Sequence, residues 1–139
     1  MATVMERLMH VQNAHDGEEM AALLAPDYRS VQPAHPSRGF GGRAQVQANW
    51  TSIFEGVPDF VAELVSSSVT GDTEWSEWEW RGRHTDGSSF AMRGVIIAVV
   101  RDDLIASARL YMEPVDEVEE DIDTAVRGVF RPPASPSPR

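Results

Sequence analysis

The sequence predicts an α+β fold in which helices come first and a meander of antiparallel strands follows. Up to residue 56, apolar side chains recur at three- and four-residue spacing, the period of helices that bury one face. From residue 59 onward, runs of β-branched and aromatic residues are cut by pairs of turn-forming residues, the pattern of strands joined by hairpins. Separate blocks of helices and strands are typical of the α+β class, and 139 residues suffice for one domain with a sizeable core.

Three helices are expected before the sheet. Two short ones, joined by a turn at Asp16-Gly17, carry the apolar residues Val4, Leu8, Val11, Met20, Leu23 and Leu24. Pro26 ends the second helix, since proline cannot continue a helix. A short extended segment from Tyr28 to Gln32 and a Pro- and Gly-rich loop over residues 33–42 follow. The third helix begins near Gly42, ends at Gly56-Val57-Pro58, and shows one apolar face made of Val46, Trp50, Ile53 and Phe54.

Four antiparallel strands are expected at residues 59–70, 73–84, 88–101 and 104–113. Gly71-Asp72, Asp86-Gly87 and Asp102-Asp103 separate them, and such pairs favour tight hairpin turns. An extra amphipathic helix is expected at residues 115–131, with a Val and Ile stripe and six carboxylates between Asp116 and Asp123. Residues 132–139, with four prolines, are expected to be disordered.

The composition excludes several kinds of function. The chain has no cysteine, so it cannot use thiol chemistry or thiolate metal sites, and its basic residues are all arginine, so lysine chemistry is excluded too. A formal net charge of −10 would repel a nucleic-acid backbone or an anionic membrane surface. The histidines lack metal-ligand spacing. We therefore expect no nucleic acid, no membrane, no metal and no cofactor.

We expect the protein in the cytoplasm. The N-terminal residues Glu6, Arg7, His10 and His15 interrupt any apolar core of a signal peptide. The longest apolar run, residues 95–100, is far shorter than the roughly 20 residues of a membrane-spanning helix.

Several short motifs occur together along residues 3–114. They are Asn13-Ala14-His15-Asp16, Leu24-Ala25-Pro26-Asp27-Tyr28, Gly42-Arg43-Ala44-Gln45-Val46, Val57-Pro58-Asp59-Phe60, Gly71-Asp72 and Arg81-Gly82-Arg83-His84-Thr85. With them this segment resembles the SnoaL-like branch of the nuclear-transport-factor-2-like superfamily. The resemblance implies a cystatin-like α+β barrel, a cone of curved antiparallel sheet closed by three helices around one deep pocket, and usually a dimer. Residues 1–114 would form this domain.

The resemblance also shows which catalytic residues are missing. Ketosteroid isomerases of this superfamily place a tyrosine, an aspartic acid and an aspartate base at positions that here carry Leu8, Ile96 and Gln32. Leu110 stands where epoxide hydrolases and polyketide cyclases have an acidic residue. The arginine and second aspartate of the hydrolases fall at about Trp78 and Trp80. The usual acid and base groups of these enzymes are therefore absent.

Strand alternation predicts which side chains face the pocket. If Ile96 points inward, Met92 on its strand and Trp78 and Trp80 on the strand before do so too. The expected ligand-binding set is Leu8, Trp50, Phe54, Trp78, Trp80, Met92, Ile96, Leu110 and Met112. Tyr28, Gln32 and His35 would orient polar groups of a substrate. Filling of the core is the alternative role of the tryptophans. Glu74, on the same face, is expected at the strand's first residue, in water.

The opposite face of the third strand is also apolar, with Val95, Ile97 and Val99 in a row. A half-solvated sheet would show polar residues there, so this row needs cover. A second copy packed sheet to sheet would provide it, making a homodimer. The apolar stripe of the C-terminal helix is the alternative cover.

Two functions from different classes remain open. The first is a pocket protein that binds or transforms a small apolar metabolite of the polyketide, terpenoid or steroid type. As an enzyme it would be a cyclase, isomerase or hydrolase of the SnoaL-like class. The second is a non-catalytic dimerisation or protein-interaction module whose tryptophans fill the cone. A cavity above roughly 300 Å³ would favour the first, and a packed interior the second.

Overall fold

The computed structural model describes residues 2–130 and shows the predicted order of helices and strands. The elements are α1 (Val4–Asn13), α2 (Gly17–Ala22), β1 (Leu24–Val31), the 3₁₀ turn η1 (Pro36–Arg38), β2 (Phe40–Gly41), α3 (Arg43–Gly56), β3 (Val61–Thr70), β4 (Thr73–Arg83), β5 (Ser89–Arg101), β6 (Leu104–Pro114) and α4 (Ile122–Phe130). The α+β class is confirmed.

Strands β3 to β6 form the predicted antiparallel meander, and each of their ends lies within two residues of its predicted position. The turns explain this agreement. Gly71, between β3 and β4, has φ of 60°, and Asp102 and Asp103, between β5 and β6, have φ of 54° and 60°. Two consecutive residues with positive φ make a type I′ turn, whose twist matches that of the strands it joins.

The sheet is mixed, whereas the sequence predicted a wholly antiparallel one. Its strand order is β2-β1-β6-β5-β4-β3, and β1 runs parallel to β6. A hairpin turn encodes the pairing of neighbouring strands, but nothing local encodes the pairing of β1 with a strand more than 70 residues away.

Strand β1 also begins earlier than predicted. Helix α2 ends at Ala22, and Leu24, expected in that helix, already pairs with Ile105 of β6. Pro26 lies inside β1, where the register with β6 shifts between Leu24 and Arg29. Proline has no N–H to donate to a ladder, so it occurs in strands at such irregular positions.

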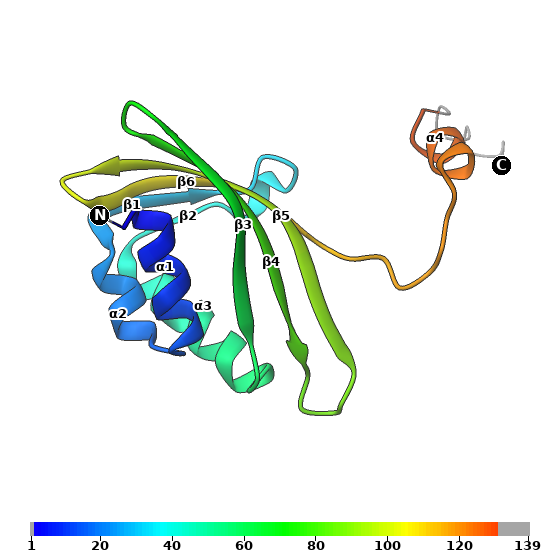
Figure 1. Ribbon diagram of the computed structural model, residues 1–139, viewed down its shortest axis with the longest axis horizontal. Coiled ribbons are helices and arrows are strands. Elements are labelled where there is room, and N and C mark those ends of the chain that lie inside the picture. Colours follow the sequence, from blue (N-terminus) through cyan, green and yellow to red (C-terminus); the bar gives the residue numbers. More distant parts are fainter. Residues whose placement is uncertain (1, 131–139) are drawn as a thin grey trace, which may run out of the picture.

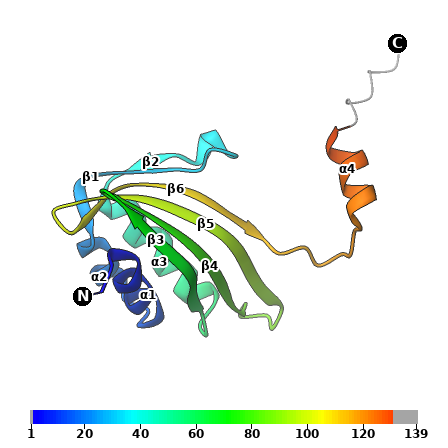
Figure 2. The ribbon, with the colours of Figure 1, turned by 45° about the horizontal axis from the view of Figure 1, so that its top comes forward.

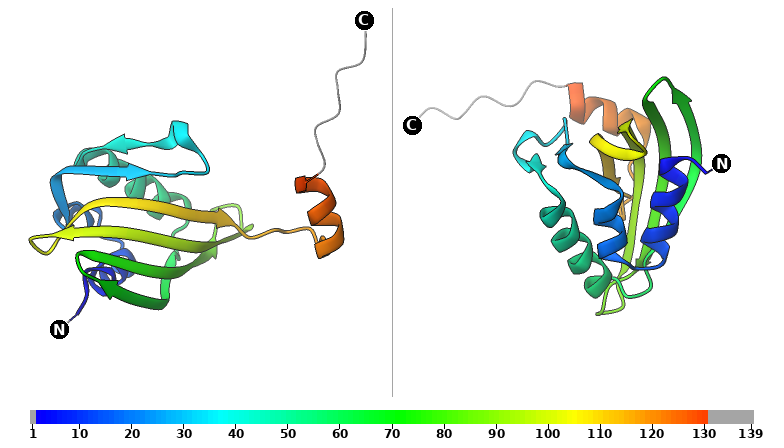
Figure 3. Two further views of the ribbon diagram at one scale, coloured as in Figure 1. Left: turned by 90° about the horizontal axis from the view of Figure 1, so that it is seen from above. Right: turned by 90° about the vertical axis from the view of Figure 1, so that its left-hand side faces the viewer.

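Helices α1, α2 and α3 lie against one face of the curved sheet and leave its other face uncovered (Figures 1 and 3). The core lies between these helices and the sheet, and its largest fully buried side chains are Trp78, Phe60, Met5 and Gln12. The sheet is curved but not closed into a barrel, so the cone has an open side (Figure 2).

Helix α4 is shorter than predicted and stands apart from the rest of the fold (Figures 1 and 2). It spans Ile122–Phe130, whereas residues 115–121 form no helix. These residues are rich in carboxylates, and repulsion between close like charges opposes a helix there. Its apolar side chains stay exposed, Ile122 at 74% and Val129 at 73%. The C-terminal helix therefore does not cover the row formed by Val95, Ile97 and Val99 on the outer face of β5. The predicted disordered tail, 132–139, lies outside the described residues.

Within residues 2–130, no helix is both long and apolar enough to cross a membrane.

Candidate functional site

A cavity of about 250 Å³ lies between the helices and the concave face of the sheet. This volume lies just below the roughly 300 Å³ at which small-molecule sites typically begin, so the cavity falls short of the size expected from the sequence for a ligand pocket. The interior is not packed solid by its own tryptophans either. The lining residues come from α1, α2, α3, every strand but β3, and the loop after β1: Met5, Leu8, Gln12, Met20, Leu24, Tyr28, Ser30, Gln32, Phe40, Val46, Asn49, Trp50, Ile53, Trp80, Met92, Ile96, Ala98, Ile105, Ala108 and Leu110.

Most of the residues predicted for the pocket line this cavity. From the expected ligand-binding set the structure brings together Leu8, Trp50, Trp80, Met92, Ile96 and Leu110. Two of the three residues expected to orient a substrate, Tyr28 and Gln32, lie there as well. Gln32 is held from outside by Arg38, whose Nη1 donates to Gln32 Oε1 at 3.2 Å.

Four predicted residues lie elsewhere. Trp78 is fully buried in the core, where its Nε1 donates to Ser76 Oγ at 2.8 Å. Phe54 stacks on the ring of His15, with ring centroids 4.7 Å apart. Met112 is buried away from the cavity, opposite Gly94.

His35 is the fourth. Its Nε2 lies 2.7 Å from Glu113 Oε1, in a half-exposed pair that ties the loop before α3 to the end of β6. The position of His35 in a proline-rich loop gave no signal for this acidic partner.

An aromatic corner closes one end of the cavity. The ring of Trp50, from α3, meets Trp80, from β4, edge to face, with centroids 5.1 Å apart. Phe60 packs edge to face on Trp50 at 5.4 Å and also contacts Trp80 at 6.1 Å. Edge-to-face contacts of this kind add to the stabilisation from burial, so Phe60 supports the two tryptophans that line the cavity.

Three polar residues of the cavity were not predicted: Gln12, Ser30 and Asn49. Their positions relative to predicted inward-facing residues could have identified them from the sequence. Gln12 lies four residues after Leu8, so both face the same side of α1. Ser30 lies two residues after Tyr28 and therefore shares its face of β1. Asn49 accepts from Gln45 Nε2 at 2.7 Å, one turn before it on α3.

Tyr28 is the one lining residue, among those that the structure describes, with a titratable side chain. Burial raises the pKa of its phenol above 10.0, and a hydrogen bond with the Ser30 side chain offsets part of that rise. The raised pKa keeps the phenol protonated at neutral pH. Tyr28 can therefore donate a hydrogen bond to a ligand but is not a base.

Glu74 corrects another expectation. It lies at the second residue of β4, yet it is only 6% exposed. Its Oε1 accepts from Met5 N at 2.9 Å and its Oε2 from Val4 N at 3.2 Å. Both carboxylate oxygens therefore hold the first turn of α1, and Glu74 lines no part of the cavity.

The cavity thus offers amide, hydroxyl, phenol and indole groups against an apolar wall. No Asp, Glu, His, Lys or Arg lines it within residues 2–130. In the same part of the chain, no cluster of three or more His, Asp or Glu could hold a metal ion. Acid–base catalysis needs a group that gains and loses a proton near neutral pH, and this lining supplies none.

Solved structures with a similar fold include proteins from Bacillus subtilis, Streptomyces antibioticus and Jannaschia. A protein from Bacillus subtilis, assigned as an isomerase, aligns with a TM-score of 0.70 and 14% identity, covering 79% of this chain and 84% of the other. IdmH of Streptomyces antibioticus, assigned as a polyketide cyclase, gives 0.69 and 22%, covering 79% and 89%. A protein from Jannaschia, assigned as a SnoaL-like polyketide cyclase, gives 0.67 and 17%, covering 94% and 91%.

Among curated protein sequences none matches this chain. At these identities the structural neighbours establish the fold alone. The model of the SnoaL-like domain family, by contrast, matches residues 5–108 directly, a span from the second residue of α1 into β6. The chain is a member of the SnoaL-like domain family.

Proposed function

We propose that this protein binds a compact, neutral and largely apolar small molecule in the cavity between its helices and its sheet. One observation carries the proposal: an unfilled cavity of about 250 Å³ whose described lining includes no residue that is charged at neutral pH. Moving a charged ligand from water into such surroundings would cost far more free energy than moving a neutral one. The net charge of −10 also opposes the approach of anions.

The size of the cavity restricts the ligand. A cavity of about 150 Å³ can hold one benzene molecule. A volume of about 250 Å³ therefore suits one or two rings, rather than the four fused rings of a steroid. Small terpenoids and small aromatic molecules of the polyketide type fit this limit, and the polyketide cyclases among the structural neighbours support that class.

If the bound molecule is also transformed, positioning carries the reaction. Tyr28 and Gln32 would orient polar groups of the substrate, while Trp50 and Trp80 shape the space around it. His35 would act only from outside, because it lies against Glu113 and not in the cavity lining.

Filling the cavity tests the proposal. Ala108 is 5% exposed and lines the cavity, so Ala108→Trp is expected to weaken binding of ethylbenzene at least about tenfold by occupying its space. Binding would be measured by quenching of tryptophan fluorescence, together with native mass spectrometry of freshly purified protein for retained molecules. Ala98→Leu, a smaller addition to the same lining, should have an intermediate effect.

Ala48→Trp is the matched control, because Ala48 is exposed on α3 and should leave binding unchanged. Circular dichroism would verify that each variant is folded. Saturable binding that survives Ala108→Trp would place the ligand elsewhere. If the parent protein does not bind ethylbenzene and retains no small molecule after purification, the proposal is rejected and an interaction module is favoured.

We also propose that two copies pair through the outer face of the sheet. Across β4, β5 and β6, Trp75 lies opposite Ile97, and Val95 lies opposite Tyr111. Trp75 and Tyr111 are 44% and 41% exposed, so both present large apolar side chains to solvent on a face that no helix covers (Figure 3), whereas Ile97 is only 7% exposed. Exposed apolar patches mark association surfaces. Val99 lies on the same face of β5.

Trp75→Glu is expected to convert a dimer to a monomer, because the interface would bury an unpaired charge beside Glu77. Light scattering after size exclusion would measure the mass. Val118→Glu is the control, since Val118 is 79% exposed and lies outside the sheet. A monomeric parent protein, or a dimer that tolerates Trp75→Glu, would disprove this interface.

A further inference from the structure

Two buried polar atoms in the cavity wall have no hydrogen-bond partner. They are Oε1 of Gln12, an acceptor, and Nε1 of Trp80, a donor. Gln12 is 1% exposed and Trp80 is 6% exposed, and both line the cavity. Arg7 Nε also lacks a partner, but Arg7 lies outside the lining and its Nη2 donates to Asp103 O at 3.1 Å.

Such atoms are costly, because folding removes them from water without a replacement. Trp78 offers a comparison, because it lies two residues before Trp80 on the same face of β4. Its indole Nε1 has a partner, since it donates to Ser76 Oγ at 2.8 Å. Trp80 has no such neighbour and faces the cavity. The unpaired donor therefore belongs to the cavity and is not a general property of β4.

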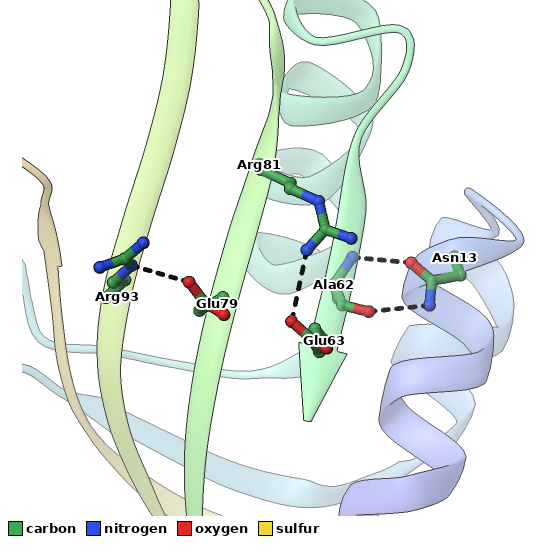
Figure 4. A network of polar contacts seen from close by, with 6 residues as sticks. All are labelled: Asn13, Ala62, Glu63, Glu79, Arg81 and Arg93. Carbon is green, nitrogen blue, oxygen red and sulfur yellow. Dashed lines mark hydrogen bonds and ion pairs between the residues drawn. The ribbon is translucent and has the colours of Figure 1, made fainter. Parts of the chain in front are cut away.

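The orphaned donor and acceptor lie at the same end of the cavity. Asn13, next to Gln12 on α1, donates from Nδ2 to Ala62 O at 3.0 Å and accepts from Ala62 N at 2.7 Å (Figure 4). Ala62 is in turn the register partner of Trp80 on the neighbouring strand. The last turn of α1 is thus fixed at the level of Trp80, which places Gln12 there too. Trp50 packs edge to face on Trp80 at this end.

We infer that the ligand carries a hydroxyl group, as an alcohol or a phenol, and that this group lies between Gln12 and Trp80. This inference rests on the proposed binding function and names the class of ligand. A hydroxyl donates one hydrogen bond and accepts others, so it can satisfy Gln12 Oε1 and Trp80 Nε1 together.

Other polar groups fit this end of the cavity less well. A ketone oxygen would accept from Trp80 but leave Gln12 Oε1 unpaired. A carboxylate would likewise offer Gln12 only acceptors. Its charge would also stay unbalanced, because no cationic side chain within residues 2–130 lines the cavity. The apolar remainder of the molecule would lie against Trp50, Met92 and the inner residues of β5.

The test compares benzyl alcohol with ethylbenzene, which has nearly the same shape without the hydroxyl. Gln12→Met keeps the length of the side chain and removes its polar atoms. The ratio of the two dissociation constants, ethylbenzene over benzyl alcohol, is expected to fall about tenfold in this variant. Comparing ratios cancels the different hydration of the two probes. Trp80→Phe, which removes the N–H group, should lower the same ratio.

One further readout, the melting temperature, separates recognition of a ligand by Gln12 from a structural role. Without ligand, Gln12→Met is expected to raise the melting temperature, because it removes a buried acceptor without a partner. A structural glutamine would do the opposite. Gln47→Met, on α3 outside the cavity lining, is the control and should leave the ratio unchanged.

The outcomes distinguish the two proposals. Binding of both probes with a ratio that neither Gln12→Met nor Trp80→Phe changes would overturn the hydroxyl inference and leave the binding function intact. An ordered water bound to Gln12 and Trp80 would give that result. No binding of either probe to the parent protein would reject the binding function itself, and the inference with it.

Discussion

Replacing Gly94 with alanine is expected to destabilise the fold by about 3 kcal/mol, enough to lower the melting temperature by about 10 °C. A Cβ at this position would overlap the carbonyl oxygen of Tyr111 and lie 2.9 Å from Cα of Met112. Both are backbone atoms of β6, the strand paired with β5 at Gly94, so no side chain can rotate away to make room. The two strands must separate there, between lining residues Met92 and Ile96.

Urea unfolding followed by circular dichroism would measure the loss. Gly56→Ala is the matched control, since nothing lies within 4 Å of its added Cβ and its φ is not positive. That variant should be as stable as the parent protein or slightly more stable, because alanine restricts the unfolded chain. Equal stability of Gly94→Ala and Gly56→Ala would show that β5 and β6 do not approach as closely at Gly94 as described.

Removing the carboxylate of Glu74 is expected to cost about 2 to 3 kcal/mol of stability. Glu74→Ala would leave the N–H groups of Val4 and Met5 buried without an acceptor, and it would remove a negative charge from the N-terminus of α1. Thr3 would remain as the only side-chain cap of this helix, through its Oγ1 and Glu6 N. Because α1 forms one wall of the cavity, ligand binding should weaken along with stability.

Glu77→Ala is the control for this experiment. Glu77 lies on the same strand but on the exposed outer face, so its loss should change the free energy of unfolding little. Glu74→Gln retains one acceptor oxygen and is expected to fall between the two. If Glu74→Ala unfolds at the same urea concentration as Glu77→Ala, the carboxylate does not hold the helix.

The sequence predicted the meander well because its signals are local. Gly71, Asp102 and Asp103 have the positive φ values that hairpin turns need, and β4 between them alternates regularly between buried and exposed residues. The pairing of β1 with β6 and the contact of Glu74 with α1 join residues far apart in the sequence, as Leu24 with Ile105 and Met5 with Glu74 show. Neither leaves a trace in the residues around it, so both had to come from the structure.

The cavity could be predicted only in part, for a related reason. Alternation shows which face of a strand a side chain occupies, but not what lies above it. Trp78 and Trp80 both point inward as predicted, yet the first is buried in the core and only the second reaches the cavity. Gln12 was missed because a polar residue on the buried side of an amphipathic helix contributes nothing to the apolar pattern that identifies the helix.

The side-chain amide of Asn13 has a consequence for the solubility of the protein. Open sheet edges recruit strands from other molecules, which leads to aggregation. At the β3 edge, Asn13 occupies both the donor and the acceptor of Ala62, as a neighbouring peptide group would, and the pairing of β3 with β4 becomes irregular between Leu64 and Ser66. At the other edge, β2 is only two residues long. Both edges thus offer little free backbone to a foreign strand at these positions, which is consistent with the pairing through the broad face of the sheet that we propose.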